Sequence, residues 1–367
     1  MCCRALGLEA ETFTTPTTII MSFGPTHDLR TRMMRVEGGE LDMGKLAEVD
    51  ALADEVVAKQ VSPQDGLRRL AEIQVGKRRF GRAIEIPTHG VTAGAIAVFF
   101  GGSLADVTVA AAIGLMLGVL AQVAKRSTDQ ARVFELLGAA FAAFTAGVVS
   151  SVWQVTPSLV TVASLIILLP GLGLTVAMTE LATRNLIAGT ARLMSAVIVL
   201  LELVVGVAIG ERAASAIVDV HQCVPIALPG WSQWVALLAA AVGVAVVVQT
   251  HPRAFGWVVA AAVVGYVGTR FGNVWLGDQM GVMVGAFAVS ALGNLYARVL
   301  ARPAQVVQVP AILLLVPGSM GFRGMESLLD RNTLNGVASV FAMFVVAIAI
   351  VAGVLISQAV VSPRRSL

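Results

Sequence analysis

Long apolar segments separated by short polar stretches dominate the chain beyond Lys77. A helix needs about 20 residues to cross the hydrocarbon core of a bilayer, and most of these segments approach that length. The pattern predicts ten membrane-spanning helices, at residues 84–101, 104–124, 133–151, 157–170, 191–210, 232–249, 254–270, 279–297, 304–317 and 336–360. The fourth and the ninth are short, and each ends at a Pro-Gly pair.

The first 82 residues have a different pattern. Residues 17–23 and 31–36 are β-branched or apolar with alternation and flank a Gly-Pro turn, which predicts two short strands. Residues 43–59 carry apolar side chains at helical spacing, and residues 62–73 begin with a Ser N-cap and a Pro at the first helical position. We therefore expect a small α+β head before the membrane helices.

Composition agrees with an integral membrane protein. Of the 367 residues, 57% are hydrophobic and 13% are charged, whereas soluble domains carry about 25% charged residues. Residues 1–76 hold more than half of the 23 acidic side chains, so the head is the polar part of the chain. The first twenty residues lack the basic and apolar regions of a secretory signal, so we expect the head to start in the cytoplasm.

Lysine and arginine gather in the loops on the head's side of the predicted spans. The loops on the far side hold only Arg212, Arg270, Arg323 and Arg331. Basic residues favour cytoplasmic loops, so this asymmetry predicts that both termini face the cytoplasm. Because orientation accounts for the basic residues, the net charge of +3 does not indicate a nucleic-acid partner.

A stretch of sequence recurs along the chain. LLPGLGLTVAMTELATRNLIAGTA (168–191) aligns with LVPGSMGFRGMESLLDRNTLNGVA (315–338) at a constant offset of 147 residues. The offset pairs Pro-Gly with Pro-Gly and Arg-Asn with Arg-Asn, which indicates internal duplication. Five predicted spans separate the copies, and an odd number inverts the second copy relative to the first.

Inverted repeats that each contain a broken hydrophobic segment are typical of secondary transporters, and the breaks mark their binding site. Proline lacks an amide proton and the break frees carbonyl groups, which are costly in hydrocarbon unless protein, water or substrate satisfies them. A helix that begins after each break would present free amides and its positive dipole end to an amino-acid carboxylate. The simpler alternative is that Pro-Gly only ends a span, but its recurrence favours a cavity.

Several segments together resemble the threonine/serine exporter family. They are PGLGLTVAMTELATRNLIAGTARL, TFTTPTTIIMSF and TRMMRVEGGELDMGKLAEVDALADEV, and with the ten-span pattern the resemblance covers nearly the whole chain. It implies a cytoplasmic head, two five-span halves, and export of small hydroxy amino acids driven by the proton motive force. Because members carry a longer stretch before ALGLEAETF, we expect this chain to begin inside that region.

The expected architecture is therefore an all-α polytopic protein of the cell membrane with an α+β head. The expected boundaries are a cytoplasmic head at 1–82, a first five-helix half at 83–210 and an inverted second half at 211–367. The expected partners are an amino-acid substrate, protons and membrane lipid, and we expect no cofactor. The sequence leaves open the preferred amino acid, the coupling stoichiometry, the role of the head and whether the protein forms a homo-oligomer.

The substrate is expected to bind between the two breaks. The candidate substrate-binding residues are Pro170, Gly171, Thr175, Glu180, Asn185, Pro317, Gly318 and Asn332. Structural or gating roles are expected for Arg184, Arg192 and Arg331. A surface ion pair between Glu180 and Arg184, four residues apart, is the simpler interpretation of those two side chains.

Glu202 lies near the middle of the fifth predicted span. An ionisable group there costs about 2.5 to 3.5 kcal/mol even on a lenient insertion scale, so we expect it to face the bundle interior and to carry the coupled proton. A structural bond to a neighbouring helix is the alternative. Glu85, Asp106, Glu135 and Asp278 fall at predicted span ends, where solvated or capping roles are expected.

The remaining motifs point to packing or to no chemistry. Small residues three or four apart at 110–118 and 280–293 allow close helix contact in lipid. GxxxxGK at 39–45 resembles a phosphate-binding loop, but Leu46 replaces the Mg-binding hydroxyl residue and nearby acids would repel phosphate. The lone His89 is expected to be a packing residue rather than a relay. The three cysteines, Cys2, Cys3 and Cys223, are expected to be free thiols. No spacing of histidine, cysteine or acidic residues suggests a metal site.

Two other classes of function remain as alternatives. A membrane-embedded hydrolase would use Thr15 or Ser22 of the head with His27, but nothing supplies an oriented acid or an oxyanion hole. A passive channel would need no coupling acid, and transport against a gradient would exclude it.

Overall fold

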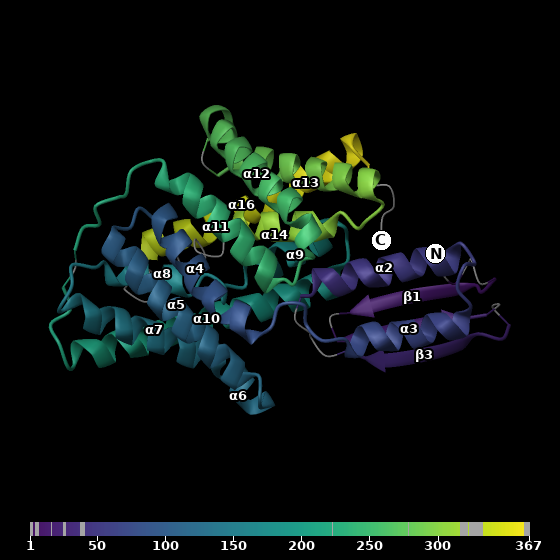
Figure 1. The fold of residues 1–367 in the computed structure, drawn as a ribbon, viewed down its shortest axis with the longest axis horizontal. Helices are drawn as coiled ribbons and strands as arrows, with labels where there is room; N and C mark the ends of the chain where they lie inside the picture. The colour runs from purple at the N-terminus through teal and green to yellow at the C-terminus, as the bar shows by residue number, and fades with distance from the viewer. Residues whose placement is uncertain are drawn as a thin grey trace.

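The computed structural model describes residues 3, 7–15, 17–24, 27–36, 41–221, 223–277, 279–315, 322 and 333–362. The head forms a lobe at one end of the molecule, and the remaining helices form a larger body beside it (Figure 1).

One layer of the head is a three-stranded antiparallel sheet in the order β1-β2-β3. β2 (Thr18–Phe23) and β3 (Arg30–Arg35) confirm the two predicted strands, and β1 (Ala10–Thr15) is a third strand that the pattern does not predict. β1 pairs with β2 along its whole length, from Ala10 opposite Phe23 to Thr15 opposite Thr18. The β1 sequence AETFTT contains only one large apolar residue, so it lacks the alternating pattern of a strand. It forms a strand because it pairs with β2.

Two helices complete the head, as predicted. α2 (Met43–Val57) begins after Asp42, whose carboxylate accepts from the Lys45 amide at 2.8 Å. α3 (Pro63–Val75) begins after Ser62, whose hydroxyl accepts from the Asp65 amide at 3.1 Å. These caps satisfy main-chain donors in the first turn of each helix. Lys45 Nζ donates to the Gln74 carbonyl at 2.9 Å and so links α2 to α3.

A helix lies in each of the ten segments expected to span the membrane. These are α4 (Arg82–Phe99), α5 (Leu104–Ala124), α7 (Phe134–Ser150), α8 (Pro157–Ser164), α10 (Leu186–Ser215), α11 (Ser232–Val247), α12 (Phe255–Leu276), α13 (Gly281–Leu300), α14 (Gln305–Leu315) and α16 (Thr333–Val360). Shorter elements lie between them: α6 (Thr128–Arg132), α9 (Gly171–Ala182) and η1 (Pro252–Ala254).

Five helices in the described part of the chain are long and apolar enough to cross a membrane unaided. They are α5, α10, α12 together with η1, α13 and α16. α8 ends at Ser164, before the first Pro-Gly pair, the described part of α14 covers 11 residues, and α4 carries Arg82 and Glu85 in its first turn. The chain is therefore a membrane protein, while the count of ten spans remains a prediction.

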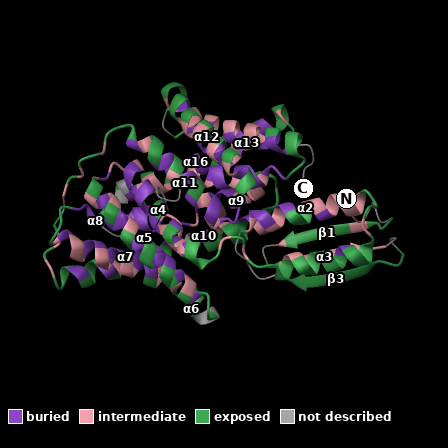
Figure 2. Cartoon of the chain, in the orientation of Figure 1, coloured by how far each residue is buried: buried purple, intermediate pink, exposed green. Residues whose placement is uncertain are grey.

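Glycines and alanines allow the body helices to pack closely, as expected for helices in lipid. α4 packs on α5, where Gly114 and Gly118 lie against the main chain of α4. α12 packs on α13, where Gly272 lies against Gly281. The predicted packing role of the two small-residue segments is confirmed. Buried residues concentrate where the body helices meet, and exposed residues cover most of the head (Figure 2).

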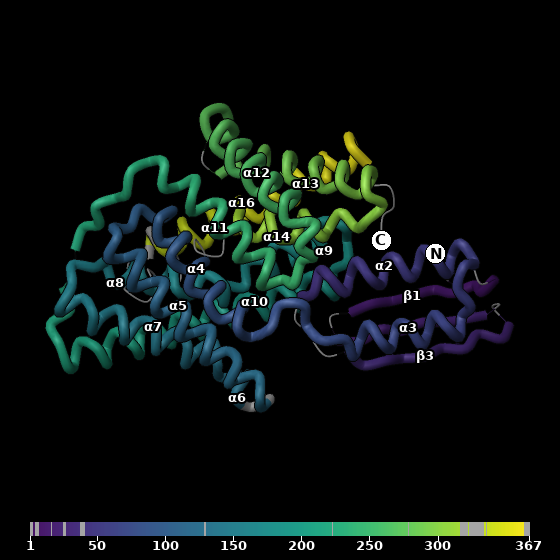
Figure 3. The backbone as a smooth tube through the Cα atoms, viewed as in Figure 1, coloured from purple at the N-terminus to yellow at the C-terminus, as the bar shows by residue number. Residues whose placement is uncertain are grey.

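The head contacts the body at the end of α11. The Met43 amide donates to the Val248 carbonyl at 2.9 Å, and the Phe80 amide donates to Gln249 Oε1 at 2.9 Å. Gln249 is fully buried. The chain path in Figure 3 shows α2 and the segment before α4 entering the body side by side. The start of α2 and the segment after α3 are thus both hydrogen-bonded to residues 248 and 249 of the body.

Candidate functional site

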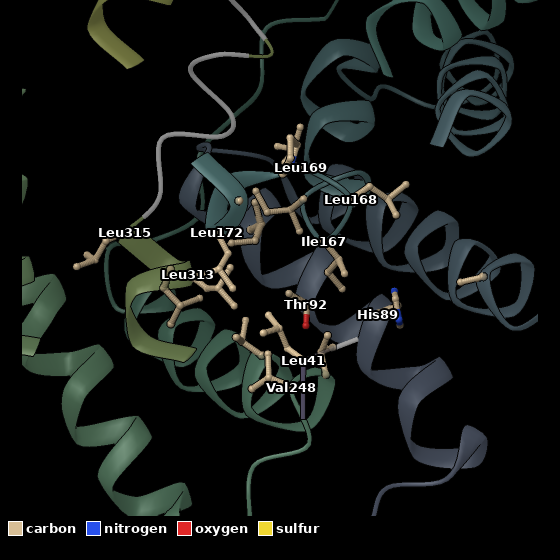
Figure 4. A pocket seen from close by; sticks show the side chains of 18 of the residues that line it. Leu41, His89, Thr92, Ile167, Leu168, Leu169, Leu172, Val248, Leu313 and Leu315 are labelled. Carbon is tan, nitrogen blue, oxygen red and sulfur yellow. The ribbon is translucent and has the colours of Figure 1, made fainter. Parts of the chain in front are cut away.

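A cavity of about 770 Å³ lies inside the helical body. Apolar side chains of α4, α11, α14 and the segment 166–169 after α8 form most of its wall. Figure 4 labels Ile167, Leu168 and Leu169 of that segment and Leu313 and Leu315 of α14. Leu41 and Arg78 reach the cavity from the head. A volume of this size accommodates a small molecule in a largely apolar site with a few polar groups.

The first Pro-Gly break borders this cavity, as the sequence predicts. α8 ends at Ser164, and α9 begins at Gly171 as a new helix. Ile166 to Leu168, Pro170, Leu172 and Gly173 line the cavity. The break therefore exposes main chain, and not only side chains, to the cavity wall.

Main-chain groups at the break have free hydrogen-bonding capacity. In the described part of the chain, no hydrogen bond reaches the carbonyls of residues 166–168 or comes from the amides of Leu172 and Gly173. Free amides are expected in the first turn of a helix, and they carry its positive dipole end. An apolar cavity thus has carbonyl acceptors on one side of the break and amide donors on the other.

The helix before the second break reaches the same cavity. Leu313, Leu314 and Leu315, the last described residues of α14, line the cavity across from the first break (Figure 4). The cavity therefore lies between the first break and the part of α14 that precedes the second Pro-Gly pair in sequence. Four predicted site residues fall outside the described part of the chain: Pro317, Gly318, Arg331 and Asn332.

Glu85 of α4 is the buried carboxylate of the cavity, with an exposed fraction of 5%. Its Oε1 accepts from Gln249 Nε2 at 2.7 Å and its Oε2 accepts from Gln122 Nε2 at 2.8 Å. Arg78 Nη1 lies 2.8 Å from Oε1 and forms an ion pair with it. The expected solvated or capping role of Glu85 is therefore wrong, because three helices and the head segment enclose it.

The position of Glu85 along α4 distinguishes it from an acid that only caps a helix. Glu85, His89 and Thr92 all line the cavity, and they stand at positions i, i+4 and i+7. This spacing places them on one face of a helix. A polar stripe on an apolar span was the signal that distinguished Glu85 from an ordinary helix-end acid.

Unpartnered hydroxyls add to the polar groups of the cavity. Among the described residues, the buried Oγ1 atoms of Thr92 and Thr269 have no hydrogen-bond partner, and both residues line the cavity. Thr92 is 2% exposed. A buried hydroxyl without a partner is unfavourable, so these two groups are suited to a polar ligand or water.

Glu202 of α10 is half-buried, and it interacts electrostatically with Glu135 in the first turn of α7. One turn further along α10, Gly206 lies against the Leu136 carbonyl, so the two helices are in main-chain contact. Glu135 lines the cavity, whereas Glu202 is not part of its lining. Glu135 has the position expected of a helix-end acid, in the first turn of α7 and partly exposed, and it also lies at the cavity wall.

The other predicted site residues near the first break lie behind the cavity wall. Thr175 is buried and its hydroxyl donates to the Gly171 carbonyl at 3.2 Å. Asn185 is exposed, and its Nδ2 donates to the Thr183 hydroxyl at 3.3 Å. Of the described candidates for substrate binding, Pro170 lines the cavity, and Gly171 follows it in a buried position.

The arginines after the break have separate roles. Glu180 pairs with Arg192 Nε at 2.9 Å, so the simpler interpretation of a pair with Arg184 is wrong. Arg184 has φ of 65° and is exposed where α9 ends. A pair with Glu180 would need Arg184 to continue the helix, four residues after Glu180. The left-handed conformation of Arg184 does not continue the helix, so its side chain turns away from Glu180. The Glu180–Arg192 pair therefore joins α9 to α10.

Asp106 has the expected capping role. It is buried in a capping box with Ser103 at the start of α5, and its Oδ1 accepts from the Thr156 amide at 2.6 Å. Asp278 lies outside the described residues. In the head, Ser22 shares a hydrogen bond with Thr31 at 3.0 Å on the exposed sheet. The described thiols, Cys3 and Cys223, are free.

Comparison with known proteins gives matches along the chain. Residues 1–213 match a model of the threonine/serine exporter family, and residues 233–360 match a second model, described as "Threonine/Serine exporter, ThrE". A protein of Eremothecium gossypii named "Pheromone-regulated membrane protein 10" is 26% identical over 87% of this chain and 45% of its own length. An uncharacterized protein of Schizosaccharomyces pombe is 26% identical over 99% of this chain and 52% of its own.

A further relative, the "Pheromone-regulated membrane protein 10" of Zygosaccharomyces rouxii, is 24% identical over 92% of this chain and 36% of its own length. The chain thus spans about half or less of the curated relatives it matches. No solved structure matches the chain.

Proposed function

Because the chain belongs to the threonine/serine exporter family, we propose that it exports small hydroxy amino acids such as threonine and serine, in exchange for protons. Family membership makes the chain a membrane transporter of a small molecule. The identity of that molecule and the exchange with protons are the proposal. The membrane is the cell membrane, with the head and both termini in the cytoplasm.

One observation carries the proposal: the same cavity is lined by the segment that contains the first Pro-Gly pair and by Leu313, Leu314 and Leu315, just before the second pair in sequence. Free carbonyls and amides in hydrocarbon are costly, so a break at this depth is stable only beside water or a polar ligand. The amides of Leu172 and Gly173 are suited to a carboxylate. The unpartnered hydroxyls of Thr92 and Thr269 are suited to the hydroxyl of threonine or serine.

We assign the cavity to the interface of two inverted five-helix halves, residues 83–210 and 211–367, behind a head of residues 1–82. The helices found in the ten expected segments support this division, as does the recurrence of the Pro-Gly pair at a constant offset in the sequence. Alternating access would then move one half against the other around the cavity.

Proton coupling is assigned to Glu202 together with Glu135. Two ionised carboxylates repel each other, and a proton bound by either one removes the repulsion. Glu135 places this exchange at the cavity wall. Substrate arrival and proton departure would thereby affect each other electrostatically.

The test of the proposed function is transport by the purified full chain in proteoliposomes. Vesicles preloaded with threonine should accumulate labelled threonine and serine by counterflow, and an imposed pH gradient should drive accumulation against the amino-acid gradient. Equilibration without accumulation would indicate a passive channel. An absence of counterflow for every amino acid tested would reject the function.

Separate variants test the coupling. Glu202→Gln and Glu135→Gln should each abolish accumulation driven by the pH gradient but retain counterflow, because exchange of labelled for unlabelled substrate needs no net proton movement. Glu55→Gln, at an exposed head acid paired with Arg69, is the control that should change neither. Unchanged coupling in Glu202→Gln would remove Glu202 from the mechanism.

A further inference from the structure

Glu85 and its partners form a receptor for a cation at the head side of the cavity. Gln122 on α5 and Gln249 after α11 each donate one hydrogen bond to the carboxylate. Both are neutral amides, so they orient the carboxylate but leave its charge uncompensated. A buried carboxylate is strongly destabilising without a positive partner.

The positive partner, Arg78, does not belong to the helical body. It lies between α3 and α4, in the last segment of the head, and its side chain is 32% exposed while that of Glu85 is 6% exposed. Its guanidinium also lines the cavity. The carboxylate is therefore held by body helices, whereas the cation comes from a segment at the cavity mouth and is partly in solvent. Partly exposed ion pairs exchange their partners at little cost.

We infer that Glu85 binds the ammonium group of the transported amino acid, and that Arg78 occupies the same place when the cavity is empty. This inference rests on the proposed function for the identity of the cargo. An ionised carboxylate offers about four acceptor positions, so an ammonium donor can take the position on Oε1 that Arg78 Nη1 now holds, while both glutamine hydrogen bonds remain. Glu85, Thr92 and the break all line the same cavity.

Competition between Arg78 and substrate gives the two residues opposite effects. Loss of Glu85 removes the binding group, whereas loss of Arg78 removes the competitor and leaves a carboxylate in need of a cation. A merely structural ion pair predicts the same effect for both losses. Whether loss of Arg78 tightens or weakens substrate binding therefore distinguishes a binding role of Glu85 from a structural one.

The experiment measures the affinity of the purified full chain in nanodiscs for three probes. They are L-threonine, 3-hydroxybutyrate, which lacks the amine, and 1-amino-2-propanol, which lacks the carboxylate. Glu85→Gln should weaken the two amines by at least about tenfold, because a charge-assisted hydrogen bond is lost. It should leave 3-hydroxybutyrate unweakened. Arg78→Ala should tighten both amines by about threefold or more, because the competing state is removed.

Two further variants keep the test decisive. Glu85→Asp retains the charge and should retain the preference for amines, even where Glu85→Gln fails to fold. Glu55→Gln removes an Arg-paired acid of the head at 2.7 Å from Arg69 and should leave all three affinities unchanged. Equal weakening of threonine by Glu85→Gln and Arg78→Ala, or equal weakening of all three probes by Glu85→Gln, overturns the inference.

The probes also separate this inference from the proposed function. Binding of 1-amino-2-propanol that depends on Glu85, without binding of threonine, supports the cation site and rejects the amino-acid cargo. Binding and counterflow of threonine that are insensitive to Glu85→Gln reject the cation site and leave the proposed function standing.

Discussion

At the scale of single residues, His251 shows how a loop beside the head depends on a neutral side chain. Its Nδ1 accepts a hydrogen bond from the Arg253 amide at 3.1 Å and so caps η1. Burial, with Arg79, Arg253 and Arg302 nearby, lowers the pKa of His251 below its ordinary value. Protonation of Nδ1 would both remove this acceptor and place a cation among arginines.

The sign of the resulting pH dependence follows from the lowered pKa. The unfolded chain binds a proton at higher pH than the folded chain, so this contribution to stability is complete above the ordinary histidine pKa and is lost as pH falls through the folded value. The melting temperature of the wild type should therefore fall on acidification below about pH 6.5. His251→Asn keeps an acceptor for Arg253 and should show a smaller fall. Parallel melting curves for the two proteins would contradict this assignment.

The residue scale also shows which site predictions the sequence supports. The break at Pro170 was predictable because an adjacent proline and glycine together disfavour continuation of a helix. The importance of Glu85 was not, because its partners Gln122 and Gln249 are distant in sequence and each is unremarkable alone. For the same reason Glu180 was assigned to a neighbour four residues away, although its partner lies on the next helix.

At the scale of helices, the contact between α7 and α10 depends on glycine. A Cβ added at Gly210 would overlap the Ala140 carbonyl and would lie 2.9 Å from the Ala143 Cβ. Main chain on both sides cannot give way as a flexible side chain does. Gly210→Ala should therefore lower stability by about 1 to 3 kcal/mol through overpacking. The measurement is thermal unfolding in detergent, followed by size-exclusion chromatography.

Gly256 provides the matched control for this contact. It also lies in a helix, α12, and an added Cβ would meet nothing within 4 Å. Gly256→Ala should be neutral or slightly stabilising, since alanine is the better helix former by about 1 kcal/mol. Equal destabilisation by both substitutions would show that the contact between α7 and α10 is not specific.

The first turn of α9 offers a variant that fills the cavity without disturbing the core. Gly173 lines the cavity, and the nearest atom to an added Cβ is the Ala196 Cβ at 3.8 Å, an ordinary contact distance. Gly173→Leu should reduce threonine counterflow by at least about tenfold by occupying the site, with an unchanged or higher melting temperature because glycine disfavours a helix. Gly256→Leu is the control that should retain transport. Full counterflow in Gly173→Leu would place the transport path elsewhere.

At the scale of the whole molecule, the features that depend on local sequence were predictable. Hydrophobic segments and turn residues predicted the helices of the body and the two helices of the head, and the structure has a helix in each of these segments. The third strand, β1, depends on its partner β2, and the attachment of the head through Gln249 depends on contacts across 169 residues. Such long-range pairs leave no periodic signal in the sequence. Leu41 in the cavity wall is the clearest case, because nothing in the head's own pattern directs it into the body.

The orientation of the whole molecule is a prediction that labelling tests directly. The basic residues lie on the side of the head, so the connection between α10 and α11 is expected outside the cell. Val224 in that connection is 89% exposed, and Gln64 on α3 of the head is also exposed. In a background where serine replaces all three native cysteines, a membrane-impermeant maleimide should label Val224→Cys in intact cells. It should label Gln64→Cys only after permeabilisation. The reverse pattern would place the head outside, and the proposed direction of transport would then be wrong, because the Arg78–Glu85 side of the cavity would face the exterior.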